Sequence, residues 1–219
     1  MDKRFSHRRI VAQIILSLQA SSSLSWRGDF SAGRKLGIRV KQGQHCTTRC
    51  IKVTWRVPDM GWFKLNIDGA SRGNPGLAGC GGVIRDTQAT IIAGFSTFID
   101  VASNVQAELR AILLGLELCQ SLHLENIWIE TDSLTSIQLL ANPPPFSWVF
   151  QDVVLRIQWL MSQLRVKISH IYREGNAVAD FLANMAIDKC LDSIFDNVSF
   201  PKQAACLASL DYLPSFRVL

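Results

Sequence analysis

The chain has 219 residues, of which 48% are apolar, so its length and composition allow one domain with a substantial core and an extension. No stretch reaches the roughly 18–20 apolar residues that a membrane-spanning helix needs, which excludes a helical membrane protein, and no membrane partner is expected. The charge is uneven, because residues 1–60 hold 12 Lys and Arg against 3 Asp and Glu, whereas residues 61–219 hold 11 against 15.

The basic residues are concentrated in residues 1–54, which are predicted to be a poorly ordered extension with one helix at about residues 8–20. An excess of basic charge favours a polyanionic partner, and a solvated basic linker is the alternative. The Arg- and Ser-rich start faintly resembles an organellar transit peptide. A remnant of a longer ancestral protein explains the same composition and is the preferred interpretation, so the compartment stays open, with nucleus or cytoplasm favoured.

The six cysteines show no convincing spacing for a metal site or a set of disulfides. Four of them lie in or beside apolar runs, which predicts buried free thiols in a reducing compartment. Cys46 and Cys50 form an isolated C-x3-C pair. A zinc site there, with His45, is the alternative, but structural zinc needs four ligands.

The ordered domain is predicted to begin at residue 55, with a linker that leads into a first strand at residues 62–68. Apolar Phe63, Leu65 and Ile67 alternate there with polar residues, which is the period of a strand. Residues 70–76 (ASRGNPG) have the composition of a turn. Short connections predict two further antiparallel strands, which lie at residues 78–86 and 90–98.

The rest of the domain is predicted to alternate between helices and strands. The expected helices are residues 104–122, 133–140, 148–164 and 176–188, and the expected strands are residues 126–131 and 166–172. This order predicts an α/β fold with a mixed sheet flanked by helices. The domain is expected to end at residue 190. Residues 191–219 form a tail without clear pattern, for which packing on the domain and disorder are both left open.

Glu108 carries the strongest argument for a functional site. At 100° per residue it lies nearly opposite the polar side of the helix at 104–122, among Ala111, Ile112 and Gly115. A carboxylate on a buried face is costly unless it is paired or coordinated. Little of the neighbouring sequence nominates an Arg partner, so metal ligation is the preferred interpretation.

Three aspartates complete a candidate metal site. Asp68 and Asp132 each end an alternating strand, and the ends of neighbouring strands converge in space. Asp180 falls in the first turn of a predicted helix, where the helix dipole favours an ionised carboxylate. Each aspartate alone has an ordinary structural explanation, but Mg²⁺ and Mn²⁺ prefer such hard oxygen ligands when several converge.

Five motifs in chain order resemble those of type 1 ribonuclease H, and especially the plant group derived from non-LTR retroelements. They are residues 66–71 (NIDGAS), 73–76 (GNPG), 107–111 (AELRA), 131–133 (TDS) and 176–183 (NAVADFLA). Residues 55–61 (WRVPDMG) resemble the start of the domain in that group, and the likeness covers residues 55–190. It implies a ribonuclease H-like fold whose five-stranded sheet has three antiparallel strands and then two parallel additions.

The resemblance also implies an activity, which is hydrolysis of the RNA strand of RNA–DNA hybrids with two Mg²⁺ ions, or Mn²⁺ in their place. Asp68, Glu108, Asp132 and Asp180 would hold the ions, and Asp68 would bridge both. The partner would be the hybrid itself, with no obligate protein partner, so a monomer is expected. His170 would assist proton transfer, although its place in an alternating strand allows simple packing instead.

Four further residues match positions that would contact the hybrid. Gly69 begins the turn that resembles the family's reader of the 2′-hydroxyl, and Asn74 and Asn104 match positions near the minor groove. Asn74 could instead only form the turn, and Asn104 only cap a helix. Arg173 would contact a phosphate.

Bacterial members of this family carry a basic helical protrusion that strengthens hybrid binding. It is missing here, because residues 141–165 hold only Arg156 and Arg165 as cations. The basic extension is the candidate substitute for that protrusion. Two alternatives to the hybrid endonuclease remain: a catalytically silent, retroelement-derived nucleic-acid-binding remnant, and an exonuclease of the same fold. The turn at residues 69–76 argues against the exonuclease.

Overall fold

The computed structural model describes residues 50–142, 148–211 and 213–218, which divide into two compact units. In one unit, β1 (Cys50–Val53) pairs antiparallel with β8 (Ser215–Val218). The other unit spans Thr54–Leu213 and holds the remaining elements. The helix predicted at residues 8–20 and the C-x3-C pair's Cys46 lie outside the described residues. No described helix has the length and hydropathy to cross a membrane.

The larger unit is built on a six-stranded mixed sheet in the order β6-β5-β2-β3-β4-β7. β2 (Phe63–Gly73), β3 (Gly76–Arg85) and β4 (Ile91–Ala102) are antiparallel, as predicted. β5 (Asn126–Thr131) and β6 (Arg165–His170) add in parallel beside β2, also as predicted. The prediction of five strands was wrong, because β7 (Ser193–Asp196) adds a sixth, antiparallel to β4.

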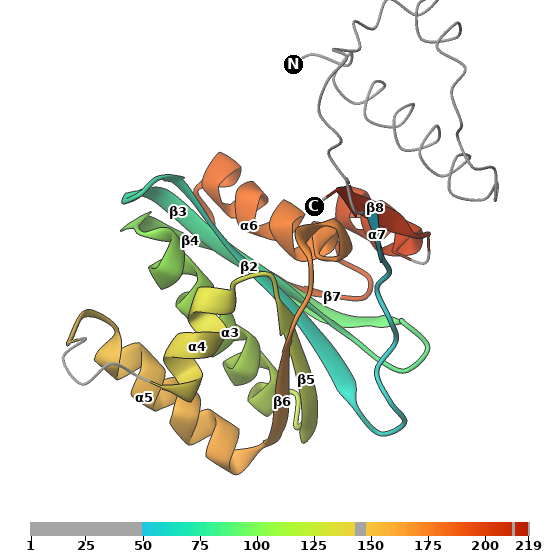
Figure 1. Cartoon of the computed structure of the whole chain (residues 1–219), viewed down its shortest axis with the longest axis horizontal. Helices are drawn as coiled ribbons and strands as arrows, with labels where there is room; N and C mark the ends of the chain where they lie inside the picture. The colour runs from blue at the N-terminus through green and yellow to red at the C-terminus, as the bar shows by residue number, and fades with distance from the viewer. Residues whose placement is uncertain (1–49, 143–147, 212, 219) are drawn as a thin grey trace, which may run out of the picture. The chain divides into compact units, whose positions relative to one another are not determined.

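Helices cover both faces of this sheet (Figure 1). On one face lie α3 (Asn104–Ser121), α4 (Leu134–Ala141) and α5 (Trp148–Gln163). On the other lie α6 (Ala177–Lys189) and α7 (Lys202–Leu210), while the short 3-10 turn η1 (Arg173–Gly175) precedes α6. The four helices predicted between residues 104 and 188 are confirmed to within two residues at each end, and α7 was not predicted.

α3 begins where the sequence provides an N-terminal cap. Ser103 and Gln106 form a capping box, in which each side chain accepts a hydrogen bond from the other residue's backbone N–H. The apolar side of the helix then packs on the alternating side chains of β2, so that Leu65 and Ile67 are fully buried. This packing forms the main core and places Glu108 against the sheet.

Residues 191–213 of the tail pack as part of the larger unit, one of the two outcomes left open for it, whereas β8 belongs to the smaller unit. Phe200 and Ala204 are buried in a second apolar cluster together with Val83 and Leu182 of β3 and α6. The thiols of Cys80 and Cys119 are free and buried as predicted. The prediction was wrong for Cys190 and Cys206, whose thiols are free but exposed, because both residues lie at the surface of the terminal segments.

Candidate active site

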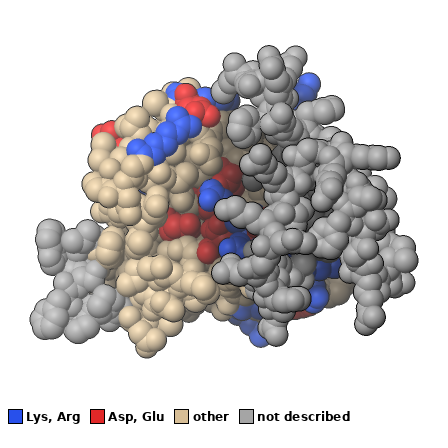
Figure 2. Space-filling model, turned by 45° about the horizontal axis from the view of Figure 1, so that its top comes forward, with Lys and Arg blue, Asp and Glu red and all other residues tan. Residues whose placement is uncertain are grey.

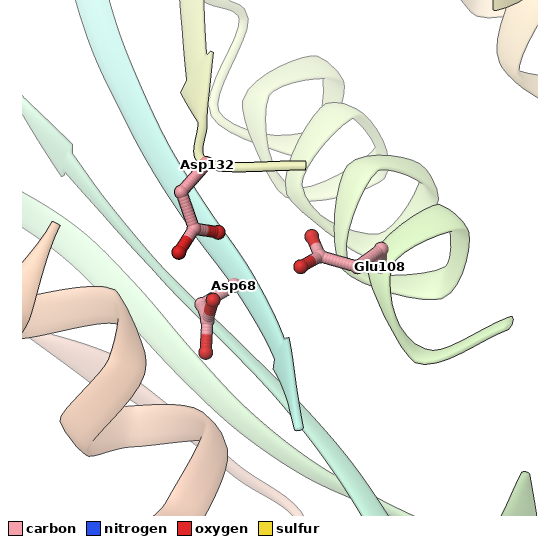
Figure 3. A group of neighbouring side chains, drawn as sticks. All are labelled: Asp68, Glu108 and Asp132. Carbon is pink, nitrogen blue, oxygen red and sulfur yellow. The ribbon is translucent and has the colours of Figure 1, made fainter. Parts of the chain in front are cut away.

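Three carboxylates from three different elements converge at one place on the larger unit. Asp68 lies within β2, Glu108 on the second turn of α3 and Asp132 directly after β5. One oxygen atom of each lies within 4.8 Å of one oxygen of each of the others. Figure 3 shows the three side chains pointing toward one another.

The parallel pairing of β2 and β5 brings the two aspartates together. Asn66 is the register partner of Glu130, so the next residue on the same face is Asp68 on one strand and Asp132 on the other. The predicted convergence of the two aspartates is therefore confirmed. The prediction that Asp68 ends its strand was wrong, because pairing with β3 continues β2 to Gly73. Figure 2 shows Asp and Glu side chains recessed in the middle of this face, with Lys or Arg side chains beside them.

Glu108 reaches the aspartates because α3 approaches β2 very closely at Gly69. A Cβ atom at that position would lie 2.2 Å from the backbone nitrogen of Glu108, so only glycine fits. The Gly69 backbone N–H donates a hydrogen bond to the Glu108 carboxylate. The Thr131 hydroxyl donates a second one to Oε2 at 3.3 Å.

Two of the three carboxylates, Asp68 and Glu108, have strongly raised pKa values. Burial, reinforced by the charge of Asp132, raises the pKa of Asp68 to about 8. Burial and the charge of Asp68 raise the pKa of Glu108 to about 9. The Oδ2 atom of Asp68 is buried and accepts no hydrogen bond from the described residues. Three converging carboxylates, one of which keeps a buried oxygen without a hydrogen bond, fit a divalent cation, whose charge would favour ionised carboxylates.

A family described as reverse transcriptase-like matches residues 66–186, which is more than half of the chain. The chain also aligns with the solved structure of RNase H1 from the archaeon Halobacterium salinarum NRC-1. The two are 31% identical with a TM-score of 0.55, over 58% of this chain and 98% of that one. The chain belongs to the type 1 ribonuclease H family.

Curated relatives agree with this membership of the ribonuclease H family. A putative ribonuclease H protein from Arabidopsis thaliana is 39% identical over 145 residues, which cover 64% of this chain and 23% of that protein. Ribonuclease HI from Halobacterium salinarum is 34% identical over 128 residues, covering 56% and 62%. The chain thus spans less than two thirds of the length of these relatives.

One further solved structure of the ribonuclease H family is similar to the chain and contains a nucleic acid. LC11-RNase H1, solved in complex with an RNA/DNA hybrid, is 29% identical with a TM-score of 0.54. The match covers 58% of this chain and 98% of that one. The predicted resemblance to the ribonuclease H family is confirmed.

Asp180, the fourth predicted ligand of this ribonuclease H-like site, lies beside the group of three but outside it. It occupies the first turn of α6, as predicted, and its Oδ1 accepts a hydrogen bond from Arg173 at 2.5 Å. Its charge contributes to the raised pKa of Asp68, so the two carboxylates are near one another. Arg173 is exposed and forms an ion pair with Asp180, which raises the pKa of its guanidinium.

The two asparagines expected near the substrate lie together at one edge of the ribonuclease H-like domain. The Oδ1 atom of Asn74, in the turn between β2 and β3, accepts a hydrogen bond from the backbone N–H of Asn104 at 3.1 Å. Asn104 is the first residue of α3, whose cap is Ser103. The alternative that Asn104 only caps the helix was therefore wrong, and its role in binding stays a prediction.

His170 ends β6 beside Thr131, and its ring meets the Tyr172 ring edge to face at 5.3 Å between centroids. It is half-buried and lies outside the group of three carboxylates. Both of its interpretations, proton transfer and packing, remain compatible with this position. Its catalytic role stays a prediction.

A buried polar layer next to the acids was missed by the sequence analysis. Its central members, Asn66, Glu130 and Asn176, are each at most 6% exposed. Strand alternation carried the available signal, because it places Asn66 on the same face as Asp68 and Glu130 on the same face as Asp132. Partners far apart in the sequence were not predictable from that signal.

Proposed function

We propose that this protein is a metal-dependent endonuclease that hydrolyses the RNA strand of RNA–DNA hybrids. The observation that carries the proposal is the set of three converging carboxylates, which occupies the predicted positions in a member of the ribonuclease H family. Relatives named ribonuclease H and a similar structure solved with an RNA/DNA hybrid support the same substrate.

Asp68, Glu108 and Asp132 would hold divalent cations, with Asp180 as the proposed fourth ligand. Two bound Mg²⁺ ions would supply an activated water and stabilisation of the leaving 3′-oxygen, which gives products with 5′-phosphate and 3′-hydroxyl ends. The buried Oδ2 atom of Asp68 accepts no hydrogen bond from the described residues, so a bound cation would supply its missing partner. Mn²⁺ is also compatible with this set of ligands.

The residues around the carboxylates would bind and select the substrate. The adjoining Asn74 and Asn104 would contact the minor groove of the hybrid, where the 2′-hydroxyl distinguishes RNA from DNA. Arg173 is exposed and would contact a phosphate once Asp180 engages a cation. His170 would hold a proton near the products.

Cleavage of a labelled RNA–DNA hybrid with Mg²⁺ or Mn²⁺ tests the proposal, beside duplex RNA, duplex DNA and single-stranded DNA. We expect internal cuts in the RNA strand of the hybrid only. The Asp68→Asn variant should lose cleavage, and Asp152→Asn, which changes an exposed acid on α5, should retain it.

The other outcomes assign the protein to one of the alternatives. Degradation of single-stranded DNA from an end would favour an exonuclease of the same fold. Absence of cleavage with either metal, by protein shown to be folded, would favour the catalytically silent binding remnant.

A further inference from the structure

A layer of buried polar side chains lies on the same face of the sheet as the acids, two residues before them along β2 and β5. Asn66 and Glu130 are register partners on β2 and β5, and each lies two residues before an acid of the cluster. Lys64, the preceding residue on that face, is fully buried and donates a hydrogen bond to Glu130 Oε1 at 2.7 Å. Its ammonium group also lies 3.6 Å from the ring centroid of Trp128.

Asn66 is the centre of this layer. Its Nδ2 atom donates to Glu130 Oε2 at 3.2 Å and to Asn176 Oδ1 at 3.4 Å. Its Oδ1 atom accepts from the Trp55 indole at 2.8 Å and from Arg85 Nη2 at 2.9 Å. A primary amide has two N–H donors and one oxygen with two lone pairs, so this side chain uses its full hydrogen-bonding capacity.

The bonds made by the Asn66 amide nitrogen lead to the segments that carry the acids. Asn176 precedes α6, and its own Nδ2 atom donates to the backbone oxygen of Ile67 at 2.8 Å. The backbone oxygen of Asn176 accepts from the N–H of Asp180 at 3.1 Å. Asn66 and Asn176 thus connect β2, immediately before Asp68, to the first turn of α6.

The bonds made by the Asn66 oxygen lead to the two ends of the compact unit. Trp55 lies in the leading segment, and its ring also stacks on the Arg85 guanidinium at 3.7 Å. Arg85 pairs with Asp211, which follows α7, and both side chains are at most 6% exposed. The same amide therefore joins the leading segment, the terminal helix and the strands that carry the acids.

The charges of this layer balance, with Lys64 and Arg85 against Glu130 and Asp211. Buried ion pairs of this kind cost about as much desolvation as they regain, so the layer is a weak source of stability. It has another consequence, because a buried polar network whose central amide makes all of its hydrogen bonds restricts the arrangement of its members. Fixed orientation is what metal ligands require from their surroundings.

We propose that Asn66 is a positioning residue for the acidic cluster, which sets the spacing of the Asp68, Asp132 and Asp180 segments for divalent cations. This inference rests on the proposed function, in which these acids hold the ions. It does not require that the hybrid be the substrate.

The Asn66→Asp variant tests this role, because it has nearly the same shape and keeps the acceptor for Trp55 and Arg85. It replaces the amide donor with an oxygen that faces Glu130 and Asn176. The matched control is Ser96→Ala, which removes a buried hydrogen bond from the Ser96 hydroxyl to the backbone oxygen of Leu182 at 2.8 Å. That bond joins β4 to the backbone of α6 and involves neither an acid of the cluster nor a member of the polar layer.

The measurements are the Mn²⁺ dissociation constant by calorimetry, melting of the metal-free protein, and cleavage of the hybrid. We expect Asn66→Asp to weaken Mn²⁺ binding about tenfold or more, the range seen when groups that orient ligands are lost. Its kcat should fall at saturating hybrid while KM stays near that of the wild type. Ser96→Ala should lower the melting temperature and leave Mn²⁺ affinity unchanged.

Wild-type Mn²⁺ affinity in folded Asn66→Asp would overturn the positioning role, even if that variant melts at a lower temperature. If Asn66→Asp does not fold, Asn66→Ser, whose side chain is too short to reach Glu130, decides by the same criterion. Failure of the proposed function is distinguishable, because a wild type that binds Mn²⁺ but does not cut hybrid refutes the activity only. A wild type that binds no Mn²⁺ refutes both.

Discussion

Replacing Asp68 with Asn should stabilise the metal-free protein while it abolishes cleavage. In the folded chain the pKa of Asp68 is raised from its ordinary value of 3.8 to about 8, first by burial and then by the charge of Asp132. The folded state therefore binds a proton more tightly than the unfolded state between about pH 4 and pH 8. Over that window the wild type should lose stability as the pH rises.

The size of the effect follows from this shift in pKa. Each pKa unit corresponds to about 1.36 kcal/mol, so an ionised Asp68 costs at most roughly 6 kcal/mol of folding free energy. Glu108 competes for the same protons and water can enter a charged cluster, so we expect a cost of about 2 kcal/mol. For a domain of this size that corresponds to a rise of about 4–8 °C in melting temperature for Asp68→Asn.

Calorimetric melting in a chelator at pH 5 and pH 8.5 provides the measurement. The gain of Asp68→Asn should be largest at pH 8.5 and shrink at pH 5, and Mg²⁺ should stabilise the wild type but not the variant. Asp152→Asn, an exposed acid, should change little at either pH. An Asp68→Asn protein that melts no higher than the wild type at pH 8.5 in chelator would refute the electrostatic reasoning.

Three other perturbations follow from the structure and the sequence. Gly69→Ala should force α3 away from β2, because the new Cβ would lie 2.2 Å from the Glu108 backbone nitrogen. The affinity for Mn²⁺ should then drop at least tenfold, and an unchanged affinity would contradict the close approach. Asp211→Ala should lower the free energy of unfolding by about 3–5 kcal/mol, because it leaves Arg85 buried without this carboxylate. A loss below about 1 kcal/mol in urea titration would contradict this role of the ion pair. Removal of residues 1–54 should weaken hybrid binding and flatten its dependence on salt, whereas equal affinity at several salt concentrations would exclude the basic extension as a contact.

The acidic site was largely predictable because each of its residues conflicts with a local pattern. Glu108 is a carboxylate on the apolar side of a helix, and Asp68 and Asp132 each follow a run of alternating apolar and polar residues. Such conflicts are visible without knowledge of the fold. The resemblance to ribonuclease H then assigned the acids to one metal site. The pairing of Asp180 with Arg173 was not visible, since proximity along the chain does not fix how two side chains meet.

The polar layer beneath the acids shows the limit of local patterns. Asn66 and Asn176 are 110 residues apart, and Arg85 and Asp211 are 126 residues apart. Nothing in the neighbourhood of Asn66 distinguishes an amide at the hub of a network from an amide exposed to solvent. The pairing depends on the register of β2 with β5 and on where the terminal segment packs.

The sequence by itself determined the helices and strands between residues 62 and 189, apart from their exact ends, and nominated the acids, because period, turn residues and misplaced charges are local properties. The resemblance to ribonuclease H implied the arrangement of five strands. Only the tertiary structure decided that residues 191–213 belong to the compact unit, that β7 extends the sheet and that Asn66 joins both ends of that unit to the acids. These features depend on contacts between distant segments. Local preferences are compatible with many sets of such contacts, and the packing of the whole core selects one of them.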